Sequence, residues 1–178
     1  MLDKNMEKTT RILMDFRYPK STERKKVMPK GMKSYQGFVM GDIYSWAHKD
    51  VKETGAIMRP SRRNSDKRFS EVWSAAQKLA NDHSIKYTTI QFNKNHKCVK
   101  HIDGTNAGIS TIIGLGNYEG GRLLIYFDGE NEPPTEVDIK NKFYEFDGSK
   151  YYHETEDFTG ERHTLVYFTR EWIPLKDR

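Results

Sequence analysis

The sequence predicts one mainly-β domain with flanking helices, built as a sandwich or barrel. From residue 85 onward, short runs rich in β-branched and aromatic residues alternate with turn residues. Seven or eight short strands with regular turns are typical of a sandwich or barrel. One amphipathic segment precedes them, and 178 residues are about enough for a single core.

The first part of the chain is polar and basic. Residues 1–33 show no sustained hydrophobic period, so we expect a basic N-terminal arm with one short element near TTRILMDFRY. Residues 34–178 are expected to form the folded domain. Within them, YQGFVMGDIYSW at 35–46 mixes aromatic and β-branched residues with glycine, which indicates an early strand.

The clearest helix is predicted over residues 66–83. Its apolar side chains recur at helical spacing and form one stripe. They are Phe69, Val72, Trp73, Ala76, Leu79 and Ala80. Asn64 or Ser65 can serve as the N-cap. Such a stripe indicates packing against a sheet and no chemistry.

The strands expected after residue 85 are IKYTTIQFN, KCVKHID, GISTIIGLG, GRLLIYF, NKFYEF, KYYH and RHTLVYFTREWI. The longest interruption, residues 128–141, is acidic and contains Pro133-Pro134. Because proline cannot donate to a sheet ladder, we do not expect a core strand there. A solvated loop is the preferred interpretation, and a flap over the site is the alternative.

Composition limits the cellular setting. The sequence contains no run of 18 apolar residues and no leader with a charged and then an apolar part, so nothing predicts membrane insertion or secretion. Cys98 is the single cysteine, which excludes an internal disulfide and fits a reducing compartment. We therefore expect a cytoplasmic or nuclear location. The oligomeric state is not decided by the sequence.

Charge is distributed unevenly. Residues 1–100 carry 22 Lys and Arg against 10 Asp and Glu, whereas residues 101–178 carry 8 against 15. This asymmetry predicts a surface that faces a polyanion. The densest basic stretches are 21–33 and 59–68, for which a solvated, partly disordered loop is the alternative. The candidate substrate-binding residues in the second stretch are Arg62, Arg63, Lys67 and Arg68.

Candidate metal ligands lie in the second half of the chain. His101 and Asp103 form an H-x-D motif at a predicted strand end, where alternation places both side chains on one face. His153 ends another predicted strand, KYYH, after the turn signal Asp147-Gly148. Two imidazoles and one carboxylate are the set that a facial Fe(II) site requires, with the opposite positions left open.

A candidate carboxylate-binding residue follows nine positions later. Arg162 lies in a G-x-R-x-T context on the predicted strand RHTLVYF, and its planar guanidinium suits a carboxylate. Thr164, Val166 and Phe168 share its face of that strand.

In order, spacing and local structure these residues resemble the Fe(II)/2-oxoglutarate-dependent dioxygenases, over roughly residues 85–170. The stretch HIDGTNAGISTIIGLGNYEGGRLLIY is similar to the branch that includes the TET/JBP-type oxygenases and their viral, phage and algal relatives. Known members of that branch oxidise the methyl group of thymine or 5-methylcytosine.

The resemblance implies a double-stranded β-helix, the jelly-roll or cupin-like barrel, with the metal in its mouth. It implies Fe(II) held by His101, Asp103 and His153, with 2-oxoglutarate and O2 as cosubstrates. It also implies that Arg162 and Thr164 bind the distal carboxylate of 2-oxoglutarate.

Three polar residues are candidates to hold the imidazoles or reach the cosubstrate, namely Gln91, Asn93 and Asn106. Hydrogen bonding within the hairpin is an equal alternative for each.

Two other histidines are possible ligands. His163 adjoins Arg162, but alternation places it on the opposite face, so His153 is preferred. His96 lies in the predicted turn NKNHK, where a histidine is normally solvated.

Three functions are compatible with the sequence. The leading hypothesis is a dioxygenase that hydroxylates a nucleic-acid base, such as the methyl group of thymine or 5-methylcytosine. The second is a prolyl or lysyl protein hydroxylase of the same superfamily. The third is a non-catalytic binding module on a relic barrel, against which stands the presence of all four site residues.

Overall fold

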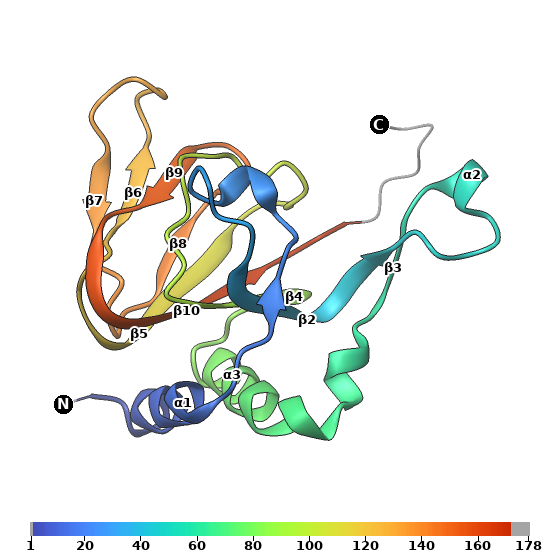
Figure 1. Ribbon diagram of the computed structural model, residues 1–178, viewed down its shortest axis with the longest axis horizontal. Helices are drawn as coiled ribbons and strands as arrows, with labels where there is room; N and C mark the ends of the chain where they lie inside the picture. The colour runs from blue at the N-terminus through green and yellow to red at the C-terminus, as the bar shows by residue number, and fades with distance from the viewer. Residues whose placement is uncertain (1, 172–178) are drawn as a thin grey trace.

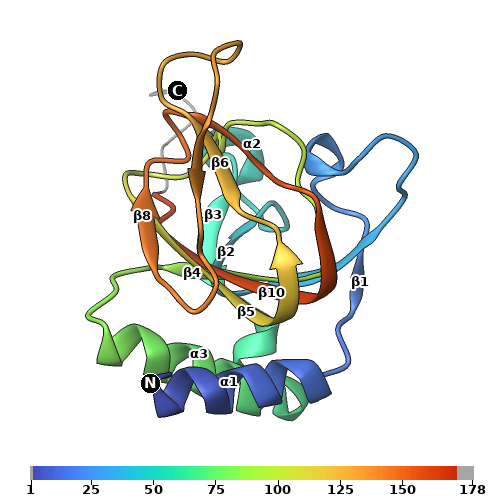
Figure 2. The same cartoon turned by 90° about the vertical axis from the view of Figure 1, so that its left-hand side faces the viewer.

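The structure, a computed structural model, describes residues 2–171 (Figure 1). The end of the predicted last strand, beyond residue 171, lies outside the described residues, as does the end of the predicted domain. Two sheets and a pair of helices form three layers, with the large sheet between the helices and the small sheet (Figures 1 and 2).

The large sheet is antiparallel throughout. Its strand order is β1 (Lys20–Ser21), β2 (Tyr35–Ser45), β4 (Thr89–Lys94), β10 (Phe158–Phe168), β5 (Ser110–Gly120) and β8 (Tyr144–Phe146), with β3 (Ile57–Pro60) paired to β2. The longest pairing joins β10 to β5, from Phe158 opposite Gly120 to Tyr167 opposite Thr111. Both strands are buried over most of the stretch where they pair, β5 from residue 110 to 115 and β10 from residue 162 to 168, and exposed residues lie at their other ends.

The small sheet contains β7 (Thr135–Val137), β6 (Leu123–Tyr126) and β9 (Tyr152–Thr155) in that order. A bridge between His101 and His153 adds the segment before β5 to its edge. From β4 onward the chain crosses repeatedly from one sheet to the other. This is the winding of a double-stranded β-helix. The predicted fold class is therefore confirmed.

Helices cover the outer face of the large sheet. They are α1 (Lys4–Asp15) and α3 (Ser70–Asp82); short helical segments elsewhere are η1 (Lys25–Val27), α2 (Val51–Thr54), η2 (Arg62–Ser65) and η3 (Lys67–Phe69). The main core lies between helices and sheet, where Leu79 and Leu13 join Phe92, Leu115 and Leu165. Burying one such side chain stabilises the fold by roughly 1.5–3 kcal/mol.

The N-terminal segment differs from the predicted arm. Helix α1 begins after Asp3, whose carboxylate caps Asn5 N–H, and it packs on α3. Met6, Thr9 and Leu13 recur on one face and are buried. The short element expected near residues 9–18 is therefore a helix of 12 residues that docks on a neighbour, because a narrow apolar stripe between charged residues is enough for that packing.

Smaller differences concern element ends. The predicted helix is present as α3, but it begins at Ser70, and its N-cap residue, Phe69, makes no capping hydrogen bond through its side chain. Asp66 caps the preceding η3, so neither Asn64 nor Ser65 is the cap of the helix. Residues 128–141 contain β7 after all: Pro133-Pro134 precede the strand, which is an exposed edge where proline is tolerated. None of the residues 128–141 lines the cavity described below.

Within residues 2–171, no helix has the length and apolar character needed to cross a membrane.

Candidate metal centre

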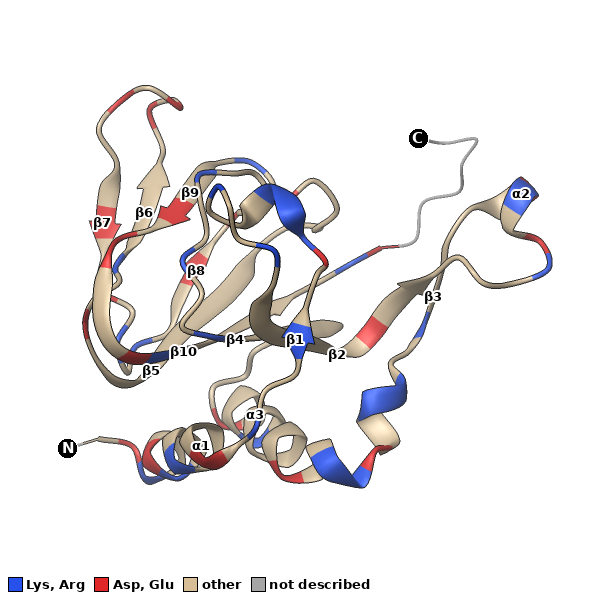
Figure 3. Ribbon diagram, viewed as in Figure 1, with Lys and Arg blue, Asp and Glu red and all other residues tan. Residues whose placement is uncertain are grey.

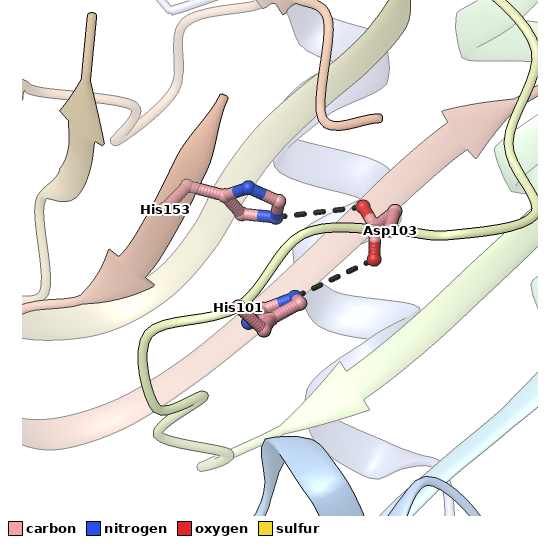
Figure 4. A group of neighbouring side chains, drawn as sticks. All are labelled: His101, Asp103 and His153. Carbon is pink, nitrogen blue, oxygen red and sulfur yellow. Dashed lines mark ion pairs between the residues drawn. The ribbon is translucent and has the colours of Figure 1, made fainter. Parts of the chain in front are cut away.

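The three predicted ligands meet at the edge of the small sheet (Figure 4). His101 and His153 exchange two backbone hydrogen bonds of 3.0 Å, which fix their side chains next to each other. Asp103 N–H donates to the carbonyl oxygen of Gly148 at 2.9 Å. The backbone of two segments that are distant in sequence, 101–103 and 148–153, therefore positions the set.

The side chains converge on one point. Nε2 of His101 lies 3.4 Å from Oδ1 of Asp103, and Nε2 of His153 lies 3.4 Å from Oδ2. One ligand atom from each residue lies within 4.8 Å of the other two. This is the spacing of groups that share one small cation.

The imidazole tautomers favour a metal between these atoms. Nδ1 of His101 donates to the carbonyl oxygen of Val99 at 2.6 Å, and Nδ1 of His153 donates to that of Tyr151 at 3.0 Å. Since a carbonyl oxygen only accepts, each Nδ1 carries the proton and, in a neutral ring, leaves an Nε2 lone pair directed at Asp103. Lone pairs that face a carboxylate repel it unless a cation lies between them, so the donor set fits a divalent metal.

Asp103 is held as an anion. Burial alone raises the pKa of its carboxyl, but the neighbouring imidazoles of His101 and His153 and the positive charge of Arg24 hold that pKa well below its usual range. The guanidinium of Arg24 lies 3.5 Å from Oδ1 of Asp103. The sequence indicated Gly148 only as a turn residue, but a Cβ there would lie 2.7 Å from Oδ2 of Asp103, so a larger residue would displace the carboxylate from this position.

A cavity of about 320 Å³ opens beside this centre. It is lined by all three candidate ligands and by every residue that the sequence proposes for the cosubstrate. These are Arg162, Thr164, Asn93, Gln91 and Asn106. Val166 and Phe168 also line it, as the predicted alternation along β10 requires.

Arg162 is a buried cation with spare donors. Arg162 is only 3 % exposed, and one Nη of its guanidinium donates to the carbonyl oxygen of Gly121 at 2.9 Å. Its Nε has no partner, and no carboxylate among residues 2–171 forms an ion pair with it. Burial lowers the pKa of its guanidinium. A buried unpaired charge is costly, so this arrangement fits an anionic ligand.

The amides on β4 support the same wall. Asn93 donates to the hydroxyl oxygen of Thr164 at 3.1 Å, and Gln91 donates to the side-chain oxygen of Asn93 at 3.0 Å. Thr164 thus accepts from Asn93 and keeps its own proton for another acceptor. Gln91 and Asn93 therefore form hydrogen bonds within the sheet, which is one of the two roles that the sequence left open, and they also line the cavity. Asn106 lies on the loop after Asp103.

The two histidines that the sequence offered as alternative ligands, His163 and His96, are both buried. His163 contacts the hydroxyl of Tyr18 at 3.0 Å and Glu161 at 2.9 Å, and it does not line the cavity, as predicted. His96 was expected to be solvated, which is wrong: it is 2 % exposed, lines the cavity and stacks on Tyr35 with ring centroids 4.3 Å apart. No spacing signal in the sequence announces this, because its neighbours come from distant segments.

The burial of His96 predicts an acid-sensitive fold. Burial, with the positive charges of Arg24, His101 and Arg162, lowers its pKa from 6.5 to about 4. As pH falls below 6.5, His96 takes up a proton in the unfolded chain but not yet in the folded protein, which favours unfolding. The contribution of His96 to the free energy of unfolding is therefore fully present above pH 6.5 and is lost as pH falls towards 4. The full effect is roughly 3 kcal/mol. Urea unfolding of wild type and His96→Phe between pH 7 and pH 4.5 should show the shallower fall in the variant; parallel curves would contradict this.

The two basic stretches lie in different places (Figure 3). Arg62, Arg63, Lys67 and Arg68 lie in η2 and η3, and none of them lines the cavity. The guanidinium of Arg63 lies 5.6 Å from the ring centre of Phe69, and that of Arg68 lies 4.5 Å from it. Phe69 belongs to the core between the helices and the large sheet.

By contrast, the stretch that contains η1 lies at the cavity. Arg24, Lys25 and Lys26 line it, as does Arg170 from the segment that follows β10. Val99 N–H donates to the carbonyl oxygen of Val27 at 3.0 Å, which ties η1 to the segment that carries His101. We call Arg24, Lys25, Lys26 and Arg170 the basic rim. The predicted basic stretch 21–33 contains three of these four residues, but the sequence did not predict that they line the cavity of the metal centre.

Fold and site together define a double-stranded β-helix with a His-Asp-His centre. NgTET1 in complex with 5mC DNA shares this fold, with a TM-score of 0.60, 16 % identity and coverage of 98 % of this chain and 71 % of that chain. OsALKBH1 gives a TM-score of 0.53 at 12 % identity, covering 96 % of this chain and 93 % of that chain. A prolyl-4-hydroxylase from Pseudomonas putida gives 0.50 at 11 %, covering 93 % and 88 %.

No protein-family model matches the sequence, and no curated protein does. The likenesses therefore show the fold, which is the one that the resemblance to the 2-oxoglutarate oxygenases implied.

Proposed function

We propose that the protein is an Fe(II)- and 2-oxoglutarate-dependent dioxygenase. The observation that carries the proposal is one cavity with a converged His-Asp-His set at one part of its wall and an unpaired, buried Arg162 at another. Fe(II) with 2-oxoglutarate and O2 supplies a hydroxylating oxidant, and the cosubstrate leaves as succinate and CO2. A relic barrel would have no need to keep both parts.

The protein's own residues position and shield the reactants. His101, Asp103 and His153 would hold the metal, with both rings fixed by their Nδ1–H bonds to backbone carbonyls. Arg162 and the hydroxyl of Thr164 would bind the distal carboxylate by charge-assisted hydrogen bonds. Apolar side chains complete the wall and exclude water, namely Ile112, Leu123, Phe146, Val166 and Phe168.

We further propose a nucleic-acid base as the substrate, with the methyl group of thymine or 5-methylcytosine as the leading candidate. The motif similarity to the TET/JBP-type branch supports this, and so do the likenesses to NgTET1 in complex with 5mC DNA and to OsALKBH1. The basic rim around the cavity supports it independently, since phosphate contacts supply much of the affinity for nucleic acid. The likeness to a prolyl-4-hydroxylase keeps a prolyl or lysyl protein hydroxylase as the second candidate.

Succinate release tests the activity. Purified protein is given Fe(II), 2-oxoglutarate and O2 with DNA or RNA oligonucleotides that contain thymine or 5-methylcytosine, or with proline- and lysine-containing peptides. We expect succinate release that requires iron and is stimulated by an oligonucleotide, with a hydroxylated nucleoside in the digest. Stimulation by peptides alone would favour the protein hydroxylase, and no iron-dependent succinate under any condition would contradict the dioxygenase.

The basic rim and the basic stretch in η2 and η3 can be compared directly. In one variant Lys25 and Lys26 are replaced by Gln, and in the matched control Arg62 and Lys67 are replaced by Gln; each loses two charges. Because Lys25 and Lys26 lie at the cavity, we expect the first variant alone to bind polynucleotides more weakly and equally across sequences. Its salt slope should flatten by about 0.7–0.9 per lost contact.

A loss in the second variant instead would place the phosphate contacts on η2 and η3, as the sequence predicts. Equal binding by both variants and wild type would remove phosphate contact from both stretches.

A further inference from the structure

His96 is the buried side chain in the cavity whose polar atoms have no use so far. Neither ring nitrogen has a hydrogen-bond partner among the described residues, although the residue is only 2 % exposed. Leaving a buried polar group unpaired is costly, so such groups are rare unless a ligand or water completes them. The Tyr35 ring, stacked at an interplanar angle of 21°, holds the plane of the imidazole.

The backbone places His96 next to the part of β10 that carries Arg162. Asn95 N–H donates to the carbonyl oxygen of Arg162 at 2.7 Å, and Arg162 N–H donates to the side-chain oxygen of Asn95 at 2.8 Å. The positive φ of 49° at Asn95 then turns the chain, and His96 is the next residue. Arg162 also has a free donor, Nε, so two side chains without full partners line the same cavity from adjacent backbone.

We propose that His96 donates a ring N–H to the distal carboxylate of the bound 2-oxoglutarate, next to Arg162 and Thr164. An ionised carboxylate has about four lone-pair positions and so can accept from all three side chains. A neutral imidazole supplies one N–H, which Tyr35 holds in a fixed orientation. This assignment rests on the proposed function, and it adds to the cosubstrate site a residue that the motif does not contain.

Binding of 2-oxoglutarate without turnover tests the assignment. Calorimetry is done without O2 and with Mn(II) in place of Fe(II), on wild type, His96→Phe and His83→Phe. The phenylalanine keeps an aromatic ring against Tyr35 and removes both nitrogens, and His83 is a matched histidine at the end of α3, outside the cavity. The second probe is 2-oxobutyrate, which has the same 2-oxo acid group but no distal carboxylate.

We expect His96→Phe to weaken 2-oxoglutarate binding about ten- to a hundred-fold, as for loss of a hydrogen bond to a charged group. Its affinity for 2-oxobutyrate should stay unchanged, and His83→Phe should match wild type for both. A variant that retains a donor, His96→Gln, should recover part of the loss. The ligand-free His96→Phe protein should unfold at or above the wild-type temperature at pH 7, because it loses an unpaired buried group.

Unchanged 2-oxoglutarate affinity in His96→Phe would overturn the assignment, and so would an equal loss for both probes. Wild type that fails to bind 2-oxoglutarate with metal would instead contradict the proposed function, so the two failures are distinguishable.

Discussion

Alanine at His101, Asp103 or His153 is expected to abolish iron-dependent succinate release while the barrel stays folded. Three protein ligands are few, and each contributes a large part of the metal affinity. Changing even a partner of a metal ligand costs roughly 10- to 100-fold, so we expect a loss of more than about 100-fold in metal affinity for a ligand itself. Two measurements check this expectation. One is the metal content of each variant after dialysis against Mn(II), and the other is its iron-dependent succinate release.

His83→Ala is the matched control, since that histidine contacts Asp3 on the helix side and lies outside the cavity. Thermal unfolding of all variants shows whether the fold persists. Folded variants at all three positions that keep wild-type metal content and turnover would remove these residues from the metal site.

Loss of Arg162 should act on the cosubstrate. Arg162→Ala deletes a charge-assisted contact worth roughly 1.5–3 kcal/mol, so we expect the 2-oxoglutarate concentration for half-maximal succinate release to rise about ten- to a hundred-fold. Arg162→Met preserves more side-chain volume and should show the same shift. Because wild type buries an unpaired cation, the ligand-free methionine variant should be no less stable than wild type.

The control is Arg11→Met on the exposed face of α1. 2-Oxobutyrate, which lacks the distal carboxylate, should bind wild type and Arg162→Met alike. An unchanged 2-oxoglutarate requirement in both Arg162 variants would move the carboxylate site to another cation.

The arrangement of the site was largely predictable because it depends on local periodicity. Two-residue alternation placed Arg162, Thr164, Val166 and Phe168 on one face of a strand, and all four line the cavity. The same argument turned His163 away from it. The order and spacing of the H-x-D motif, the second histidine and the arginine supported the resemblance to the 2-oxoglutarate oxygenases, and that resemblance implied the double-stranded β-helix.

The missed features depend on contacts between segments that are distant in sequence. His96 is buried because Tyr35, from β2, stacks on it, and the basic rim exists because Val27 bonds to Val99. Helix α1 is stable because α3 accepts its narrow apolar stripe. Neither hydrophobic period nor motif spacing contains information on such pairings.

The most direct measurement is an anaerobic titration of the protein with Fe(II) and 2-oxoglutarate, followed by visible absorption. Chelation of the metal by the 2-oxo acid gives a charge-transfer band that neither component gives alone. We predict that the band saturates at one Fe(II) and one 2-oxoglutarate per chain, and that it is absent in Asp103→Ala and requires more 2-oxoglutarate in Arg162→Met. No band in wild type, or the same band in Asp103→Ala, would contradict the assignment of this cavity as an Fe(II)/2-oxoglutarate site.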